Sequence, residues 1–325
     1  MSNLRIGTSG WNYPSGPGTW NGVFYPRASR RKGGKQAVDQ LAYYAERFDT
    51  VEVNSTFYGQ PRPEVTRAWC RRTPPGFEFS LKLYQKFTHP EMFKTASAGT
   101  LRGERLEVTE ADVDEFRLGV DPIASHGRLG VLLAQFPPSF KNTPETREYL
   151  EWLLRAFREY PVAVELRHRS WSDDLSETLT LLNRYSSAWT QIDEPKFRFS
   201  IRQNYLPNVT GFYYLRLHGR NAATWWRHEQ ADDRYDYLYS PQELEPFAET
   251  AKAARMLVKK LYLYLNNHFA AKSVANALVL KRQVSEPIPG DYEPELIRRY
   301  PELAGVVTPA THPASQPMEL VQKPT

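Results

Sequence analysis

The stretch TVEVNSTFY, residues 50–58, decides the fold because it places charge inside a segment with the pattern of a buried strand. In an extended chain Val51 and Val53 lie on one face, and Glu52 and Asn54 lie on the other. A solvated sheet edge would accommodate Glu52 easily. An interior strand would bury its charge at high cost unless a partner neutralised it. The remainder of the sequence distinguishes these two environments.

Eight short apolar segments recur along the chain, and their lengths and compositions are typical of strands. They are LRIGTSG (4–10), TVEVNS (50–55), EFSLKLY (78–84), RLGVLLAQF (128–136), PVAVELRH (161–168), SAWTQID (187–193), GFYYLRLHG (211–219) and KKLYLYLNNH (259–268).

Helical patterns follow most of these segments. Thr143 and Ser240 are each followed by a proline, which is typical of a helix cap and the first helical position. Eight strand-then-helix units within residues 1–285 predict a single α/β domain with the (β/α)8 TIM-barrel fold, which typically has about 250 residues.

Three regions depart from a regular barrel. Residues 94–127, after the third strand, are long and polar and predict a helical excursion. Residues 194–210 show no clear helix, which predicts an irregular sixth unit. Residues 286–325 form a proline-rich C-terminal tail, whose last portion, THPASQPMELVQKPT, is expected to be mobile.

The composition is that of a soluble globular protein, since 41% of the 325 residues are hydrophobic and 24% are charged. The net charge of +5 and the pI near 9.1 suit a nucleic-acid or anionic partner but are also ordinary for a basic cytosolic protein. A single cysteine, Cys70, excludes an internal disulfide. We expect a cytoplasmic protein with no membrane partner, because neither a signal-peptide pattern nor an apolar run of about 18 residues occurs. The sequence indicates no oligomeric state.

The strand segments separate polar from aliphatic residues by parity. Alternate residues of a barrel strand point inward, and helices cover the outside, so we expect the aliphatic residues to face outward and the other set inward. The inward set is Gly7, Ser9, Glu52, Asn54, Ser80, Lys82, Tyr84, Leu133, Gln135, Glu165, Arg167, Gln191, Asp193, Tyr214, Arg216, His218, Tyr262, Tyr264 and Asn266.

The polar residues of this set gather at the carboxyl ends of the strands, where enzymes of the TIM-barrel fold place their chemistry. Burying several acids and bases there without a ligand would be expensive. The pattern therefore predicts a charged pocket at the carboxyl-terminal face. Within it we expect Glu52 to pair with Lys82 on the next strand.

Several motifs together resemble the YecE-like family, also called domain of unknown function 72. They are IGTSGWNYP (6–14), FYP (24–26), TVEVNSTFYGQP (50–61), FSLKLYQKFTH (79–89), LLAQFPPSF (132–140), VELRHRSW (164–171), LRLHGR (215–220) and YLNNHFAAKSVANAL (264–278).

This resemblance implies a TIM barrel and carries no established reaction. It extends from about Ile6 to Leu280. The family's pattern falls on Glu52, Asn54, Lys82, Gln135, Glu165, Arg167, Trp171, Arg216, His218 and Asn267.

A metal site finds little support. No HExxH or CxxC motif occurs. Four oxygen or nitrogen donors could converge on a divalent cation, although the three bases expected in the same layers would repel it. The donors are Glu52, Glu165, Asp193 and His218, and the bases are Lys82, Arg167 and Arg216. We assign no metal ligands and expect no cofactor. Binding of a divalent metal stays an open alternative.

Two loops could contact a ligand directly. The run SRRKGGK (29–35) is basic and suits phosphate or nucleic acid, although a solvated charge run is the simpler explanation. Aromatic residues near both ends of the barrel sequence could stack on a sugar or base, or could pack the barrel mouth. They are Trp11, Tyr13, Trp20, Phe24, Tyr25, Trp225 and Trp226.

These observations favour an enzyme that acts by acid/base chemistry on a small anionic molecule such as a phosphorylated sugar or a nucleotide. Hydrolase, lyase and isomerase reactions all stay open. The catalytic candidates are Glu165, Glu52, His218 and Asp193. The ligand-binding candidates are Lys82, Arg167, Arg216, Asn54, Gln135, Tyr84, Asn266, Asn267 and Trp11.

Among the catalytic candidates we expect Glu165 to be the reacting group. It lies about 7 Å along its strand from Arg167, which could hold the substrate anion. Two alternatives stay open: a nucleic-acid-binding or repair-associated protein that uses the basic aromatic loops, and a non-catalytic scaffold.

Overall fold

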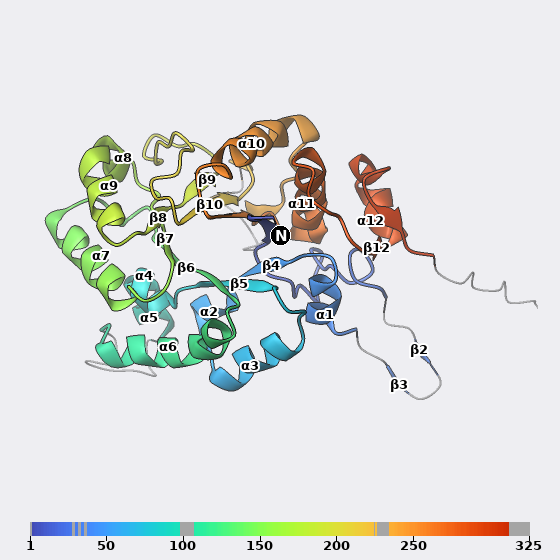
Figure 1. The fold of residues 1–325 in the computed structure, drawn as a ribbon, viewed down its shortest axis with the longest axis horizontal. Helices are drawn as coiled ribbons and strands as arrows, with labels where there is room; N and C mark the ends of the chain where they lie inside the picture. The colour runs from blue at the N-terminus through green and yellow to red at the C-terminus, as the bar shows by residue number, and fades with distance from the viewer. Residues whose placement is uncertain are drawn as a thin grey trace, which may run out of the picture.

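The protein has a mixed α/β fold in which helices surround parallel sheets (Figure 1). The structure, a computed structural model, describes residues 2–27, 30–31, 34–35, 38–97, 107–223, 225 and 234–311. The basic run at 29–35 therefore lies largely outside the described residues, as do Trp226 and residues 312–325.

Two parallel sheets form the centre of the described chain. One has the strand order β1-β11-β10-β9 and the other has the order β4-β5-β6-β7-β8. Their bounds are β1 Leu4–Thr8, β4 Thr50–Val53, β5 Glu78–Lys82, β6 Leu129–Gln135, β7 Val162–Glu165, β8 Ala188–Trp189, β9 Gln191–Asp193, β10 Phe212–Leu217 and β11 Lys260–Leu265. Each of the eight segments expected to be strands contributes to one of these sheets.

The edges of the two sheets meet just beyond β1. The backbone N–H of Gly10 donates to the carbonyl of Glu52 on β4 at 2.7 Å. Only Thr190 separates β8 from β9, and its N–H donates to the carbonyl of Val164 at 2.9 Å. These bonds hold the two sheets against each other.

Local capping explains where the larger helices begin. Thr143 and Ser240 each form a capping box with the residue three positions later, and Pro144 and Pro241 occupy the first helical position. Both starts agree with the expectation from the sequence. The helices are α1 Gln40–Ala45, α2 Ser55–Tyr58, α3 Pro63–Arg71, α4 Gln85–Thr88, α5 Pro90–Ala96, α6 Glu110–Ser125, α7 Pro144–Ala156, α8 Ser170–Asp173, α9 Leu175–Arg184, α10 Pro241–Ala254, η3 Phe269–Ala271, α11 Lys272–Gln283, α12 Pro294–Arg299 and η4 Pro301–Leu303.

The regions that the sequence predicts to be irregular can now be compared with the structure. The polar stretch after β5 contains α5 and α6, and residues 194–210 contain no helix. Beyond α11, the short strands β12 (Asp291–Tyr292) and β13 (Thr308–Pro309) pair with each other. The side chains of Tyr292 and Leu296 in this region are fully buried. The first part of the C-terminal region therefore packs on the core, and the domain boundary at residue 285 stays a prediction.

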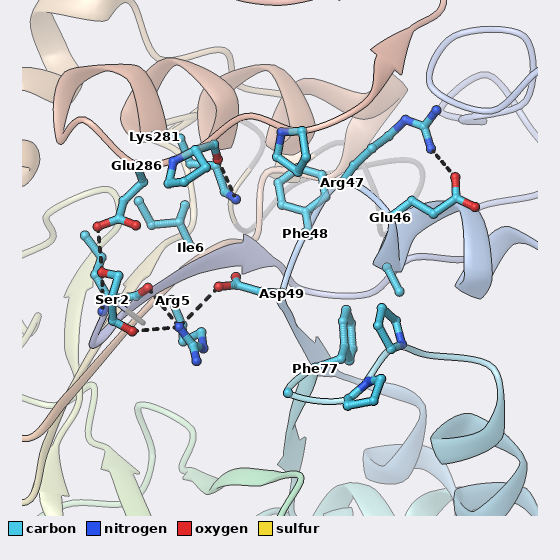
Figure 2. Close-up of a pocket in the computed structure, with 17 residues that line it drawn as sticks. Ser2, Arg5, Ile6, Glu46, Arg47, Phe48, Asp49, Phe77, Lys281 and Glu286 are labelled. Carbon is cyan, nitrogen blue, oxygen red and sulfur yellow. Dashed lines mark hydrogen bonds and ion pairs between the residues drawn. The ribbon is translucent and has the colours of Figure 1, made fainter.

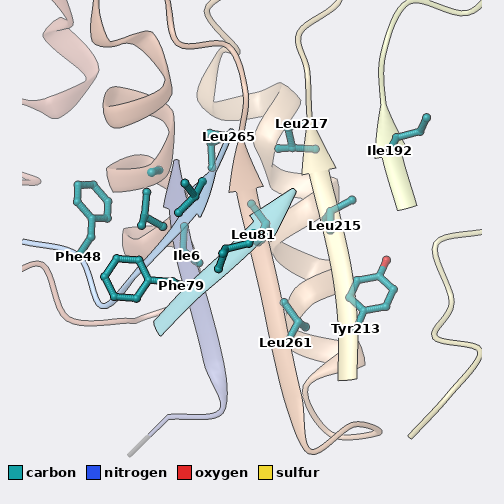
Figure 3. Close-up of a cluster of buried hydrophobic side chains, with 14 of the residues drawn as sticks. Ile6, Phe48, Phe79, Leu81, Ile192, Tyr213, Leu215, Leu217, Leu261 and Leu265 are labelled. Carbon is teal, nitrogen blue, oxygen red and sulfur yellow. The ribbon is translucent and has the colours of Figure 1, made fainter. Parts of the chain in front are cut away.

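Alternate strand residues belong to two different hydrophobic clusters. The larger cluster contains strand residues such as Val53, Val164 and Leu217 together with helical residues such as Leu278. Figure 3 shows this outer set on β1, β5, β9, β10 and β11. The smaller cluster draws its buried members from both sheets: Val131, Leu133, Ala163, Ala188, Phe212, Tyr214, Tyr262 and Tyr264. This division follows the predicted alternation.

No helix in the described part of the chain is both long and apolar enough to cross a membrane. Two further short strands, β2 Arg30–Arg31 and β3 Gly34–Lys35, pair in the loop after β1.

The close approach of β1 to β4 makes Gly7 the most constrained glycine of these strands. A Cβ atom on Gly7 would lie 2.4 Å from the carbonyl oxygen of Thr50, which is backbone and cannot rotate away. We expect Gly7→Ala to lower the free energy of unfolding by about 1–3 kcal/mol because the sheets must separate locally. Chemical denaturation followed by circular dichroism measures this change.

Gly211→Ala is the matched control, because a Cβ there would meet no atom within 4 Å. Its stability should stay within about 1 kcal/mol of the unmodified protein. If the two variants are equally stable, the close contact between Gly7 and the backbone of Thr50 does not constrain the fold.

Candidate functional site

A cavity of about 560 Å³ opens at the carboxyl ends of the strands. It occupies the face where parallel α/β folds place their ligands. Six strands or the residues directly after them contribute polar side chains to its lining: Asn54, Lys82, Gln135, Arg167, Arg216 and Asn266.

Loops and short helices complete the lining. The aromatic part includes Tyr13 and His268, whose rings stack with centroids 4.3 Å apart. The full set of these additional residues is Tyr13, Phe57, Tyr58, His89, Met92, Pro137, Pro138, Trp225, Arg234, Tyr235 and His268.

Arg216 is the centre of the charged cluster beneath this cavity. Its Nε and Nη2 donate to the two carboxylate oxygens of Glu52 at 2.9 Å and 2.6 Å. Tyr214 and Ser9 also donate to that carboxylate, each at 2.7 Å. Arg216 and Glu52 are 1% and 0% exposed, so this fork of hydrogen bonds lies in the interior. Glu52 is therefore not on a solvated edge.

The expected pairing of Glu52 with Lys82 is wrong. The guanidinium of Arg216 on β10 reaches both oxygens of Glu52 on β4, whereas Lys82 forms no ion pair among the described residues. Residues on adjacent strands need not form an ion pair. Here the long side chain of Arg216 reaches Glu52 from the other sheet.

A second carboxylate, Glu165, lies between two guanidiniums. Nη1 of Arg216 donates to its Oε2 at 2.6 Å, and Nε of Arg167 donates to its Oε1 at 2.8 Å. Burial alone would raise the pKa of Glu165, but the charges of Arg216 and Arg167 outweigh it and hold that pKa well below its usual range. Arg167 also lies 3.1 Å from Glu194.

Lys82 has a different environment from these paired groups. Its Nζ lies 3.9 Å from the centre of the Phe57 ring and forms no hydrogen bond among the described residues. Burial lowers the pKa of Lys82 to about 7, with Arg216 acting in the same direction and Glu165 opposing. Lys82 therefore loses its proton more readily than an ordinary lysine does.

Two histidines near Lys82 are held neutral. Burial lowers the pKa of His218 to about 3, and burial followed by the charge of Lys82 lowers the pKa of His89 to about 3. His218 lies with Nε2 3.2 Å from Arg167 and Nδ1 2.9 Å from the amide of Asn266. It connects the charged cluster to the end of β11.

Of the residues selected from the sequence, six line the cavity and three lie directly behind its arginines. The six are Lys82, Arg167, Arg216, Asn54, Gln135 and Asn266, and the three are Glu52, Glu165 and His218. The roles assigned to them stay predictions.

Four selected residues do not line this cavity. Asp193 accepts hydrogen bonds from Tyr239 at 2.7 Å and from Arg220 at 2.8 Å and 3.0 Å. Asn267 donates to Tyr237 and Asn276, both at 2.8 Å. The ring of Tyr84 packs against Phe87 and Phe93, and Trp11 packs against Trp69. These four residues were selected by strand parity or by their place in the sequence, but their side chains contact neighbouring helices and loops instead of the cavity.

The lining residues that the sequence analysis did not select include His89, His268, Arg234 and Tyr235. A signal existed for the histidines, because each follows a strand that already carried a selected residue, Lys82 or Asn266. Arg234 and Tyr235 lie in a loop with no such pattern.

One polar atom of the lining stands out. Oδ1 of Asn54 is buried and has no hydrogen-bond partner among the residues that the structure describes. A buried acceptor without a donor costs free energy, so a ligand hydroxyl at this position would satisfy it.

Metal-binding geometry is not present in the described part of the chain, where no three His, Cys, Asp or Glu side chains group as ion ligands. Three of the four donors considered above are paired with arginines, Asp193 with Arg220 and both Glu52 and Glu165 with Arg216.

A second cavity, of about 390 Å³, lies at the amino ends of β1, β4 and β5 (Figure 2). Its charged residues pair with each other, as Arg5 does with Asp49 at 3.2 Å and Arg47 with Glu46 at 3.1 Å. None of the selected site residues lines it. The cavity at the carboxyl ends is therefore the candidate functional site.

Comparison with known proteins identifies relatives along most of the chain. The family model described as "Protein of unknown function DUF72" matches residues 5–296. The chain is 26% identical over 285 residues to UPF0759 protein YunF of Bacillus subtilis (strain 168), which covers 84% of this chain and 92% of that protein. It is 27% identical over 158 residues to UPF0759 protein YecE of Escherichia coli (strain K12), covering 48% of this chain and 52% of that protein.

Two solved structures share the fold. A DUF72 family protein from Thermotoga maritima superimposes with a TM-score of 0.71 at 32% identity, covering 87% of this chain and 99% of that chain. A DUF72 family protein from Enterococcus faecalis gives a TM-score of 0.72 at 21% identity, covering 89% and 99%. None of these names states an activity.

The buried fork between Arg216 and Glu52 generates a stability prediction. Glu52→Ala leaves a buried guanidinium with one of its two acidic partners missing, so we expect the free energy of unfolding to fall by about 3–5 kcal/mol. Thermal and chemical denaturation measure the loss.

Glu249→Ala provides the control, because its ion pair with Lys252 is exposed and screened by water. The melting temperature of this variant should hardly change. A Glu52→Ala protein as stable as Glu249→Ala would show that the fork contributes nothing to the fold.

Proposed function

We propose that this chain, which belongs to the DUF72 family of proteins of unknown function, is an enzyme that binds a small anionic substrate in the cavity at the carboxyl ends of its strands and transfers a proton through Lys82. The observation that carries this proposal is a cavity whose charged lining groups, among the described residues, are all basic and in which Lys82 forms no ion pair.

The lining chemistry supports an anionic substrate. Lys82, Arg167 and Arg216 present nitrogen donors to the cavity, and no Asp or Glu side chain is among the described residues that line it. Glu52 and Glu165 lie behind the arginines and fix their orientation. An anionic group would meet charge-assisted donors at the front of the cluster, and Asn54 would accept a substrate hydroxyl. A phosphorylated sugar or a nucleotide has both features.

Proton transfer at neutral pH requires a group whose pKa lies near that pH. Lys82 meets this condition, whereas Glu165 is held ionised by two guanidiniums. We therefore transfer the acid/base role that the sequence suggested for Glu165 to Lys82. In this proposal Glu165, Glu52 and His218 position Arg167 and Arg216, and neither metal nor cofactor takes part.

We also propose that the two sheets are parts of one (β/α)8 barrel. Counting β8 and β9 as one strand, the order runs β1, β4, β5, β6, β7, β8/β9, β10, β11 and returns to β1. The smaller hydrophobic cluster, which both sheets build, would fill the barrel interior.

Nucleic-acid binding is the second candidate function, and a basic hollow of about 450 Å³ favours it. Arg169, Lys196, Arg198 and Arg202 line this hollow beside Phe197. The rings of Phe197 and Phe199 stack with centroids 5.6 Å apart. Basic groups next to aromatic rings are typical of single-strand nucleic-acid surfaces.

Titration with inorganic sulfate tests the first function, because sulfate keeps its charge across the relevant pH range. At pH 6, isothermal titration calorimetry should show binding that Lys82→Met weakens about ten-fold, since a charge-assisted hydrogen bond is lost. Between pH 6 and pH 8 the unmodified protein should lose about five-fold in affinity as Lys82 deprotonates through a pKa of about 7. Lys82→Met should lack this pH dependence.

Lys252→Met serves as the control, because Lys252 is on the exposed face of α10 and pairs with Glu249. Equal sulfate binding by the Lys82→Met and Lys252→Met proteins would overturn the proposal. Oligonucleotide binding that falls steeply with salt and is lost in Arg198→Ala, without any effect of Lys82→Met, would favour the second function instead.

A further inference from the structure

We propose that Lys82 forms a covalent imine with the aldehyde or ketone carbonyl of an anionic substrate. This inference rests on the proposed function and narrows the substrate to a small oxo acid or a phosphorylated carbonyl compound.

Imine formation needs an amine that is neutral and is not held by a hydrogen bond or an ion pair. Lys82 ends β5 and forms no hydrogen bond or ion pair among the described residues. Lys86, four residues later, provides the contrast, because its Nζ donates to both carboxylate oxygens of Asp112 at 2.9 Å. A lysine paired in that way keeps its proton, whereas a desolvated lysine beside other cations is a nucleophile.

Burial favours the neutral form of Lys82, and the charges of Arg216 and Arg167 act in the same direction, whereas Glu165 and Glu52 favour the charged form. His89 lies near Lys82 in its neutral form. Because the two glutamates are already bound by arginines, neither is available to pair with the amine. The ring of Phe57 covers one side of the amine and excludes water there.

The cavity can also hold a carbonyl substrate in place. Arg167 and Arg216 line the same cavity and can bind the anionic group. The carbonyl carbon would then lie toward Lys82. In the strand order, β6 with Gln135 lies between β5, which carries Lys82, and β7, which precedes Arg167. Proximity of this kind converts a slow bimolecular attack into an effectively unimolecular one.

The chemistry balances without a co-reactant. The lone pair of Nζ attacks the carbonyl carbon, and a proton passes from nitrogen to oxygen to give a carbinolamine. The C–O bond then breaks, and the oxygen leaves as water with the second hydrogen of the amine. The product is a C=N bond between Lys82 and the substrate, which withdraws electrons from the adjacent carbon.

Reductive trapping tests this proposal. The protein is incubated at pH 7 with glyoxylate, pyruvate or dihydroxyacetone phosphate in the presence of cyanoborohydride, which reduces an imine to a stable secondary amine. Mass spectrometry of the intact protein and of its peptides should find one adduct, on Lys82, formed at least ten-fold faster than on Lys86 or Lys252. Sulfate should slow its formation.

Two variants separate the imine from the rest of the proposed function. Lys82→Arg keeps a positive charge but cannot form an imine, so it should retain sulfate binding and lose trapping. Lys82→Met should lose both. Circular dichroism spectra that match the unmodified protein show that each variant is folded.

The outcomes are distinguishable. Lys82-dependent sulfate binding without an adduct would overturn the imine and leave the proton-transfer function intact. If the unmodified protein neither binds sulfate nor forms a trapped adduct, both proposals are overturned. Adducts spread equally over the lysines, or persisting on the Lys82→Arg protein, would contradict the assignment of Lys82.

Discussion

The structure depends on one buried guanidinium. Arg216 on β10 binds Glu52 on β4 and Glu165 on β7, and so it joins three strands that belong to two sheets. Two carboxylates and a guanidinium can share the interior only when the hydrogen bonds are nearly complete, because each charge has lost its water. The two-pronged contact with Glu52 and the single contact with Glu165 meet this condition.

This arrangement separates the charges by depth. The acids lie inside, the arginines lie in front of them, and the cavity begins at the arginines and at Lys82. Because the arginines already bind the acids, Lys82 forms no ion pair among the described residues. Burial is the main cause of the lowered pKa of Lys82, and the charge of Arg216 adds to it. A residue that stabilises the fold in this way also contributes to the reactivity of its neighbour.

The sequence carried much of this information but not all of it. The eight strand segments and the inward parity of Glu52 and Glu165 could be predicted, since alternation with a period of two follows directly from an extended chain. The pairing could not, because it depends on which strands face each other across the sheets and on how far a side chain reaches. Asp193 shows the limit, since its parity selected it but the loop residue Arg220 binds it. His268 shows the opposite error, because it shares the parity of Asn266 and lines the cavity but was not selected.

The unpaired state of Lys82 is the central claim, and its titration tests it most directly. After reductive methylation with ¹³C-formaldehyde, the dimethylamine signal absent from the Lys82→Arg protein identifies Lys82 in NMR spectra. We predict that this signal titrates with a midpoint near pH 7. A Lys82 signal that stays protonated above pH 10 would contradict the account, because it would reveal an acidic partner that holds the proton.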